Sequence, residues 1–313
     1  METLKKNFKK MSMKKSLYII LLAMLTVTAT GQQFPFMEGY NLNPFDMIPS
    51  YAGLVNPKTV FIDYRTDWTG IEGGPVTYNL SYSDRLKENI GIGGRFVYDK
   101  TDIFKQVMLL GTYTYEVQVL KDHYINFGVS AGFYKNSIDF GKYYNDPDYV
   151  EDPALTYGTE RSHIKVATDI SALYRYKNIE GGILFSNIVF GTAKYSATDI
   201  TYKPLKNYLV HASYRYEVSE AWTVKPFLML RGGQHYPPQF EIASEVSYNS
   251  RFWGMLLFRT GGIWGMSFGA EVHDGIYLNY SYNLSSDIAL NTFGSHQITM
   301  GINLSHFSFI TNK

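Results

Sequence analysis

The chain contains no cysteine among its 313 residues. Disulfides therefore cannot support the fold, and attachment to a membrane through a lipidated N-terminal cysteine is excluded. Basic side chains are also scarce. The first 31 residues hold six lysines and one glutamate, which leaves 23 basic against 27 acidic residues in the remainder. This balance offers no basic surface for nucleic acid, so we expect no nucleic-acid partner.

Patterns that mark catalysis or metal binding are missing as well. The seven histidines are scattered, without a pair at ligand spacing or a His-Glu motif of the zinc-protease kind. No local motif marks a nucleophile, which disfavours a hydrolase. The acidic stretch 145–153 holds Asp146, Asp148, Glu151 and Asp152, but it lacks the glycine of calcium loops. We expect no catalytic residue, cofactor or metal, and we interpret this stretch as a solvated loop and candidate partner surface.

Long apolar runs are absent after residue 31, and the run that precedes it is short. Lysines between residues 5 and 15 come before the apolar run 17–27, and the small residues Ala29 and Gly31 follow it. This layout is typical of a secretory signal peptide, because a transmembrane helix needs about 20 apolar residues. We expect residues 1–31 to be removed and the remainder to be exported.

What the exported part has in abundance is aromatic residues and a period-2 alternation. The chain holds 27 tyrosines and 20 phenylalanines, and Ile298, Met300 and Ile302 alternate with the polar Thr299 and Asn303. Such alternation predicts strands with one apolar and one polar face. Fourteen strands are expected, at 58–68, 75–85, 90–99, 105–119, 124–139, 163–176, 180–190, 208–218, 222–231, 239–248, 251–259, 263–272, 276–284 and 295–307.

The lengths of the connections separate two all-β classes. Connections after even-numbered strands are all short, whereas the long ones follow odd-numbered strands, at 140–162, 191–207, 232–238 and 285–294. A soluble sandwich or solenoid has no reason to sort loops in this way. An outer-membrane barrel has tight periplasmic turns and long extracellular loops. The sequence therefore predicts a 14-stranded antiparallel transmembrane β-barrel in the bacterial outer membrane, in contact with its lipid and with both termini periplasmic.

Residues 32–57 do not alternate, and they carry four prolines. Proline cannot donate a hydrogen bond within a sheet, so this segment is not expected to be a barrel strand. We predict three parts: a signal peptide at 1–31, a non-strand segment at 32–57 that either plugs the lumen or lies at the periplasmic rim, and the barrel at 58–313.

Charged residues in the alternating strands are expected to face the lumen, because a charge facing lipid costs about 2–4 kcal/mol at mid-membrane. We interpret them as a solvated or mutually paired network, or as residues that grip a plug or a cargo tail. Trp68, next to the turn glycines 70, 73 and 74, is expected at the membrane interface. The predicted lumen network comprises Asp63, Arg65, Asp169, Arg175, Arg215, Glu217, Glu241 and Glu245.

Several stretches resemble the PorP/SprF family of type IX secretion system outer-membrane proteins. The first two are "NPFDMIPSYAG" at 43–53 and "YRTDWTGIEGGPVTYNLSY" at 64–82. The hairpins at 90–119 and 125–133 are similar to those that follow in the family. Asp67 stands where the family stretch has glutamine. The positions that carry the resemblance are Asn43, Pro44, Pro49, Tyr51, Ala52, Gly53, Arg65, Trp68, Gly74 and Pro75.

The resemblance implies a non-enzymatic part of an export and gliding apparatus of Bacteroidota. Members of the family assist the secretion or surface attachment of cargo with a C-terminal sorting domain, as in gliding adhesins, together with other type IX components. Some relatives are linked instead to peptidoglycan-associated components. The polar lumen face leaves one alternative open, which is a pore for small solutes.

Overall fold

The computed structural model describes most of the chain after the expected signal peptide. Only the backbone is described for residues 159–161, 187, 189, 190, 193–195, 198–202, 207 and 236. The described residues are 36–139, 159–161, 164–190, 193–195, 198–202, 207–233, 236–286 and 292–307.

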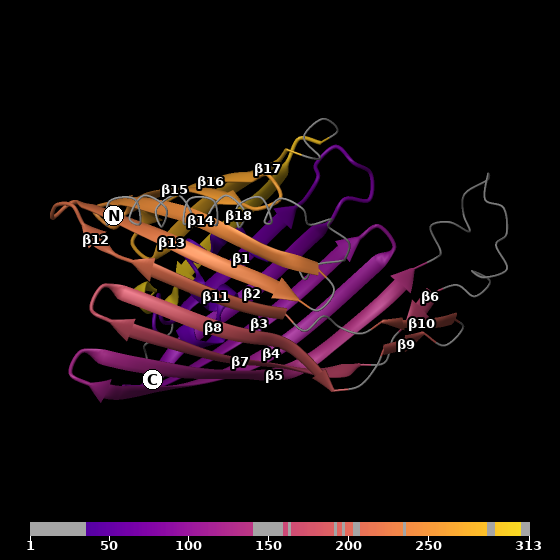
Figure 1. Cartoon of the computed structure of the whole chain (residues 1–313), viewed down its shortest axis with the longest axis horizontal. Helices are drawn as coiled ribbons and strands as arrows, with labels where there is room; N and C mark the ends of the chain where they lie inside the picture. The colour runs from indigo at the N-terminus through magenta and orange to yellow at the C-terminus, as the bar shows by residue number, and fades with distance from the viewer. Residues whose placement is uncertain are drawn as a thin grey trace, which may run out of the picture.

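Within the described residues, fourteen antiparallel strands close into a barrel, as the alternation predicts (Figure 1). Each strand pairs with the next along the chain, and the first strand pairs with the last over eight residue pairs, which closes the ring. The strands are β1 (Thr59–Thr66), β2 (Val76–Lys87), β3 (Ile90–Thr101), β4 (Phe104–Leu120), β5 (His123–Asp139), β7 (Lys165–Tyr176), β8 (Ile179–Phe190), β11 (Asn207–Tyr214) with its continuation β12 (Tyr216–Glu217), β13 (Trp222–Gly233), β14 (Tyr236–Tyr248), β15 (Phe252–Arg259), β16 (Ile263–His273), β17 (Ile276–Ser285) and β18 (Ser295–Asn303).

The two ends of the barrel differ in their connections. One end, the turn end, has connections of two to four residues, at 88–89, 121–122, 177–178, 218–221, 249–251 and 274–275. At the turn 249–251, Asn249 and Ser250 both have positive φ, which suits a tight hairpin. The other end, the loop end, has the longer connections at 67–75, 140–164, 191–206 and 286–294. Strand β1 begins and β18 ends at the turn end.

Two local expectations are wrong. Residues 232–238 form no long loop, because only 234–235 separate β13 from β14. Pro237 and Pro238 lie at the start of β14, before its pairing with β15 begins at Glu241, so their missing N–H groups leave no gap on that side. The last strand stops at Asn303, and its side chain accepts a hydrogen bond from the Ser305 amide at the start of the short helix η4 (Leu304–His306).

Two of the expected loops contain short strands of their own. Strand β6 (Thr159–Arg161) pairs with the end of β5 inside the expected loop 140–162. Strands β9 (Ala193–Tyr195) and β10 (Thr198–Tyr202) form a hairpin inside the expected loop 191–207. The acidic stretch 145–153 lies outside the described residues.

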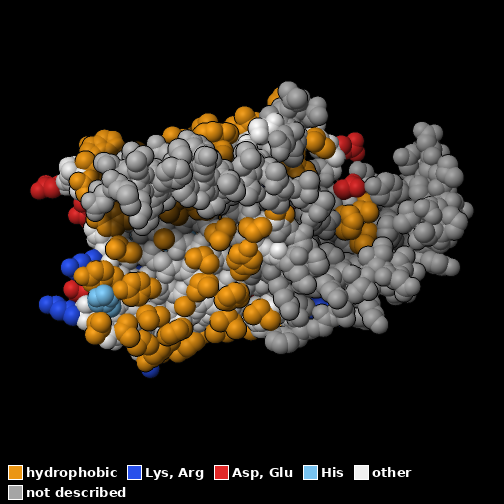
Figure 2. All heavy atoms as spheres, in the orientation of Figure 1, with side chains coloured by type: hydrophobic (Ala, Val, Ile, Leu, Met, Phe, Trp, Pro, Cys, Tyr) orange, Lys and Arg blue, Asp and Glu red, His pale blue; other side chains and the backbone are white. Residues whose placement is uncertain are grey.

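The outer wall of the barrel is apolar (Figure 2). In β1 the outward Ile62 and Tyr64 are exposed and alternate with the buried Phe61 and Asp63; on β15, Leu256 is 70% exposed. A monomeric soluble protein rarely exposes apolar surface on this scale, whereas a barrel in lipid requires it. Among the described residues, none of the helices is long and apolar enough to cross a membrane.

Residues 36–57 lie inside the barrel. They form three single turns, η1 (Glu38–Asn41), α2 (Pro44–Met47) and η2 (Pro49–Tyr51), and we call residues 36–57 the lumenal segment. Pro44 and Pro49 stand at the starts of α2 and η2, where a proline's missing N–H leaves no intrahelical bond unmade. The segment is therefore built from short turns linked by extended residues, and it contributes no strand to the wall.

The lumenal segment divides the lumen into an apolar and a polar half. On one side Phe45, Met47 and Ile48 pack in a single buried cluster with wall residues of β7, β8, β11 and β13–β15. On the other side the segment meets Gln297 of β18 and Ser81 of β2 through hydrogen bonds. Fully burying one large apolar side chain contributes about 1.5–3 kcal/mol, so the apolar half is the main source of packing energy.

Candidate functional site in the barrel lumen

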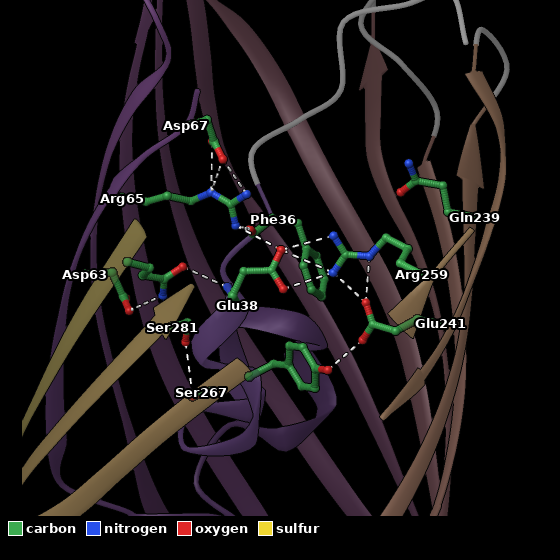
Figure 3. A network of polar contacts seen from close by, with 12 residues as sticks. Phe36, Glu38, Asp63, Arg65, Asp67, Gln239, Glu241, Arg259, Ser267 and Ser281 are labelled. Atoms are coloured by element: carbon green, nitrogen blue, oxygen red, sulfur yellow. Dashed lines mark hydrogen bonds and ion pairs between the residues drawn. The ribbon is translucent and has the colours of Figure 1, made fainter. Parts of the chain in front are cut away.

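Glu38, from the lumenal segment, is held by two arginines of the wall (Figure 3). Its carboxylate lies 3.0 Å from Arg65 of β1 and 2.9 Å from Arg259 of β15. The Glu38 side chain is only 2% exposed. Burial by itself raises the pKa of this carboxyl, but Arg259 and Arg65 outweigh it and hold the pKa at about 2. Glu38 therefore remains charged, and it joins two strands from different parts of the wall.

Each of these arginines has a second acidic partner. Arg259 donates through Nε to Glu241 of β14, at 2.7 Å. Arg65 donates through Nε and Nη2 to the carboxylate of Asp67, with distances of 2.7 to 3.1 Å. Charge-assisted bonds of this forked kind are the strong ones. Asp67, which the sequence left unexplained, thus orients Arg65 toward Glu38.

We call Glu38, Arg65, Asp67, Glu241 and Arg259 together the Glu38 clamp. Further contacts hold the residues of this clamp and those next to it. Arg65 also donates from Nη1 to the carbonyl oxygen of Phe36, at 2.7 Å. The guanidinium of Arg231 lies 4.3 Å from the ring centroid of Phe36. The Tyr40 hydroxyl donates to Glu241 at 2.6 Å. A buried charge needs partners of this kind, because an unpaired one costs several kcal/mol.

A pair of acidic residues lies in the polar half of the lumen. The Asn79 side-chain amide donates to Asp46 of α2 at 2.7 Å and to Asp63 of β1 at 2.8 Å. Thr299 and Gln297 of β18 donate to the other oxygen of Asp63. Burial, followed by the negative charge of Asp63, raises the pKa of Asp46 to about 8. Near neutral pH the Asp46 carboxyl therefore keeps its proton.

The turn-end half of the segment is fixed by weaker contacts. The Tyr51 hydroxyl donates to Glu180 of β8 at 3.3 Å and lies 3.5 Å from a ring nitrogen of His211. Lys225 forms an ion pair with the same Glu180, at 3.1 Å. The Ser50 amide donates to Ser171 at 3.0 Å. The lumenal segment is thus anchored along its whole length.

The structure does not place the predicted lumen network in one cluster. Arg65 and Glu241 belong to the Glu38 clamp, while Asp63 accepts from Asn79, Gln297 and Thr299 in the polar half. Glu245 accepts from Asn41 at 3.0 Å. Asp169 pairs with Arg95, at 3.4 Å. Arg175 pairs with Glu116, and its guanidinium lies over the Tyr124 ring.

Two members of the predicted network lie apart from it. Arg215 and Glu217 are 54% and 66% exposed, and the ion pair that they form is with each other, at 3.7 Å. Their strand is interrupted at residue 215, where β11 passes into β12 near the turn end. They therefore take no part in holding the lumenal segment.

The family-signature positions fall at turns and at segment-to-wall contacts. Asn43 donates to Asp46 and to Ser81. The Ala52 carbonyl accepts from Thr114, and Gly53 has a φ of +75° with its Cα close to the Asp84 carbonyl. Pro75, which follows Gly74, accepts a hydrogen bond from the Asp67 amide.

Trp68 was expected to serve as an interface anchor. It is 41% exposed in the connection 67–75, and its φ is +54°. This left-handed conformation is rare for a bulky residue and is costly. The connection therefore holds a strained turn directly after the Glu38 clamp residue Asp67, and the role of Trp68 as an anchor stays a prediction.

Several residues of the site were not predicted from the sequence, and most of them have no local signal. Glu38, Asp46, Arg231 and Arg259 were not among the predicted site residues. Arg259 was detectable, since it ends an inward row of β15 that is otherwise apolar, with Met255 and Leu257. An isolated charge on a buried face requires a partner, although the sequence does not say which.

The chemistry of the site is that of an anchor. Its acids are paired with arginines, amides or hydroxyls, and no group of three or more His, Asp or Glu in the described residues could hold a metal ion. An arrangement of paired charges and packed apolar side chains holds one segment against a wall. The closed ring and the apolar outer wall define the class of this molecule, which is a transmembrane β-barrel of the outer-membrane type.

The family model of the type IX secretion system membrane protein PorP/SprF matches residues 29–302. The chain belongs to the PorP/SprF family, and the resemblance seen in its sequence is confirmed. The match covers both the lumenal segment and the barrel wall down to the last residues of β18. Fold and family together support a location in the outer membrane.

Solved structures share only a slight likeness with the chain, and comparison with curated proteins gives no significant match. A monoaromatic hydrocarbon channel, CymD, is 12% identical with a TM-score of 0.48, over 87% of this chain and 93% of that one. A FadL homologue of Pseudomonas aeruginosa is 8% identical with a TM-score of 0.47, over 88% and 93%. The translocator domain of the autotransporter NalP from Neisseria meningitidis is 14% identical with a TM-score of 0.43, over 85% and 94%. Likeness at this level carries no argument about function.

Replacing Glu38 with glutamine tests the Glu38 clamp. The change removes one buried charge between Arg65 and Arg259, and we expect a loss of about 3 kcal/mol in the free energy of unfolding, the low end for a broken buried pair because Asp67 and Glu241 remain. Urea unfolding in detergent micelles measures the loss. The matched control is Glu220→Gln at the exposed turn end, which should change stability by less than about 0.5 kcal/mol. Equal effects of the two substitutions would contradict the clamp.

The raised pKa of Asp46 predicts a pH dependence of stability. Below pH 4 Asp46 is protonated in both the folded and the unfolded chain. Between pH 4, near the ordinary pKa of an aspartate, and about pH 8, only the folded chain keeps the proton on Asp46. The contribution of Asp46 to the free energy of unfolding therefore falls as the pH rises through this range, and it levels off above pH 8. The advantage of Asp46→Asn over the wild type should therefore grow from pH 5 to pH 8 in urea unfolding. An advantage that does not vary with pH would contradict the prediction, and Asp122→Asn at an exposed turn is the control.

Proposed function

We propose that this protein is a non-enzymatic outer-membrane component of the type IX secretion system that binds cargo with a C-terminal sorting domain and helps to export it or anchor it at the cell surface. The observation that carries the proposal is the family match across both the barrel and the lumenal segment, residues 29–302. The system's other components are its further partners.

The orientation follows from the two unlike ends of the barrel. Outer-membrane barrels keep short turns in the periplasm and long loops outside the cell. We therefore place the turn end of this barrel in the periplasm, together with the start of β1 and the end of β18. The loop end then faces the exterior, and the connections 140–164 and 191–206 are the surfaces offered to cargo.

The lumen supports a binding role over a solute pore. Apolar residues of the lumenal segment such as Phe45, Met47 and Ile48 are 0–4% exposed, which means that the wall packs against them. The Glu38 clamp and the Asp46 contacts fix the same segment through ion pairs and hydrogen bonds. A pore needs a continuous water-filled path, and a buried, anchored segment stands in its way.

Loss of the gene tests the proposal through the proteins at the cell surface. We expect the deletion strain to lose proteins with a C-terminal sorting domain from its surface, and the wild-type gene to restore them. A gene whose connection 191–206 is replaced by a glycine-serine linker of equal length should restore the folded barrel, seen by heat-modifiable electrophoretic mobility, but not the cargo. A surface proteome unchanged by the deletion would contradict the proposed function.

A further inference from the structure

We propose that the lumenal segment runs through the barrel from the loop end to the turn end, so that its Phe36 end opens at the loop end and not at the turn end. The inference concerns the path of the lumenal segment, and its placement at the cell surface rests on the orientation proposed above. It follows from where the successive residues of the segment touch strands whose directions are known.

The segment leaves the lumen at the turn end. The Lys58 amide, which directly precedes β1, donates to the Ser83 carbonyl in the second half of β2. Gly53 lies against the Asp84 carbonyl of the same strand, where a Cβ atom would come within 2.5 Å of the oxygen. The Ala52 carbonyl accepts from Thr114 of β4, at 3.2 Å. These strands meet the turn end at these residues, so the last part of the segment lies there.

Further back in the sequence the contacts move up the barrel. Ser50 touches Ser171 and lies close to Gly128, six residues into β5 from the turn end. Asp46 is bonded to Asn79, which faces Asp63 at the middle of β1. Each step toward the N-terminus thus brings the segment closer to the loop end.

The first described residues reach the loop-end part of the wall. The carbonyl of Phe36 accepts from Arg65, the last but one residue of β1. Glu38 pairs with Arg259, the last residue of β15. The ring of Phe36 lies against the guanidinium of Arg231, the third residue from the end of β13. All three strands run from the turn end to the loop end. At about 3.4 Å per residue, Arg65 lies roughly 20 Å along the strand from the start of β1.

A return from Phe36 to the turn end would need a second path through the same lumen. On the apolar side Tyr40, Phe45 and Ile48 are packed against the wall. On the polar side Asn43 and Asp46 are bonded directly to β2. Both flanks of the segment are therefore in contact with the wall, and its Phe36 end faces the opening at the loop end.

This path revises one expectation from the sequence. An even number of strands puts the beginning of β1 and the end of β18 at the same end, but it does not say where the segment before β1 leads. The expected periplasmic C-terminus agrees with the orientation proposed above. For the Phe36 end of the lumenal segment we propose the opposite face of the membrane.

The absence of cysteine allows a direct labelling experiment, because a single introduced thiol is the only one in the chain. Three variants are expressed in whole cells: Gln33→Cys, Glu72→Cys as the loop-end control and Glu220→Cys as the turn-end control. Each is treated with a membrane-impermeant maleimide before and after the outer membrane is permeabilised, and heat-modifiable mobility confirms that each barrel is folded.

We expect Gln33→Cys to be labelled in intact cells like Glu72→Cys, with Glu220→Cys labelled after permeabilisation. Labelling of Gln33→Cys together with Glu220→Cys would overturn the inference, and so would a Gln33→Cys thiol that reacts only after denaturation. If the two controls exchange their behaviour, the proposed orientation fails, while labelling of Gln33→Cys together with Glu72→Cys would still support the path through the lumen.

Discussion

Closure of the sheet is the constraint on which the rest of this structure depends. Backbone N–H and C=O groups have no partners in lipid, so a strand protein can span a membrane only as a ring without edges. Here the ring closes through eight residue pairs between β1 and β18. A ring of fourteen strands encloses more space than its own inward side chains fill, since about eight strands suffice for a side-chain-filled interior. The lumen therefore needs an occupant, and the chain supplies residues 36–57.

The occupant is matched to the wall in two different ways. Its apolar residues pack against β7, β8, β11 and β13–β15. This burial stabilises the bound segment, but the hydrophobic effect is non-directional and does not fix the segment's position. Its polar residues meet β1, β2 and β18 through bonds of defined geometry, with Glu38 joining Arg65 to Arg259. Packing alone would allow the segment to slide or turn. A buried charge between two arginines does not allow it, because any shift leaves a charge unpaired.

The sequence predicted the wall well and the interior poorly, for physical reasons. Alternation is a local pattern, so the sequence predicted the strands and their number. It also predicted that the connections at one end of the barrel are shorter than those at the other. The expected loop at 232–238 was wrong because prolines also occur at strand starts, as Pro237 and Pro238 do. The Glu38 clamp joins residues 221 positions apart, and no local pattern links them. Asp63, Arg65 and Glu241 were expected in the lumen from alternation, whereas Glu38, which pairs with Arg65 and with Arg259, lies in a segment with no periodicity.

The lumenal segment fills the barrel and blocks a water-filled path through its lumen. Current across a planar bilayer measures this directly. The account predicts that the purified intact protein gives no stable conductance steps at neutral pH, and that a variant lacking residues 36–57 but otherwise folded gives discrete open steps. Stable open steps from the intact protein, equal to those of the variant, would contradict it.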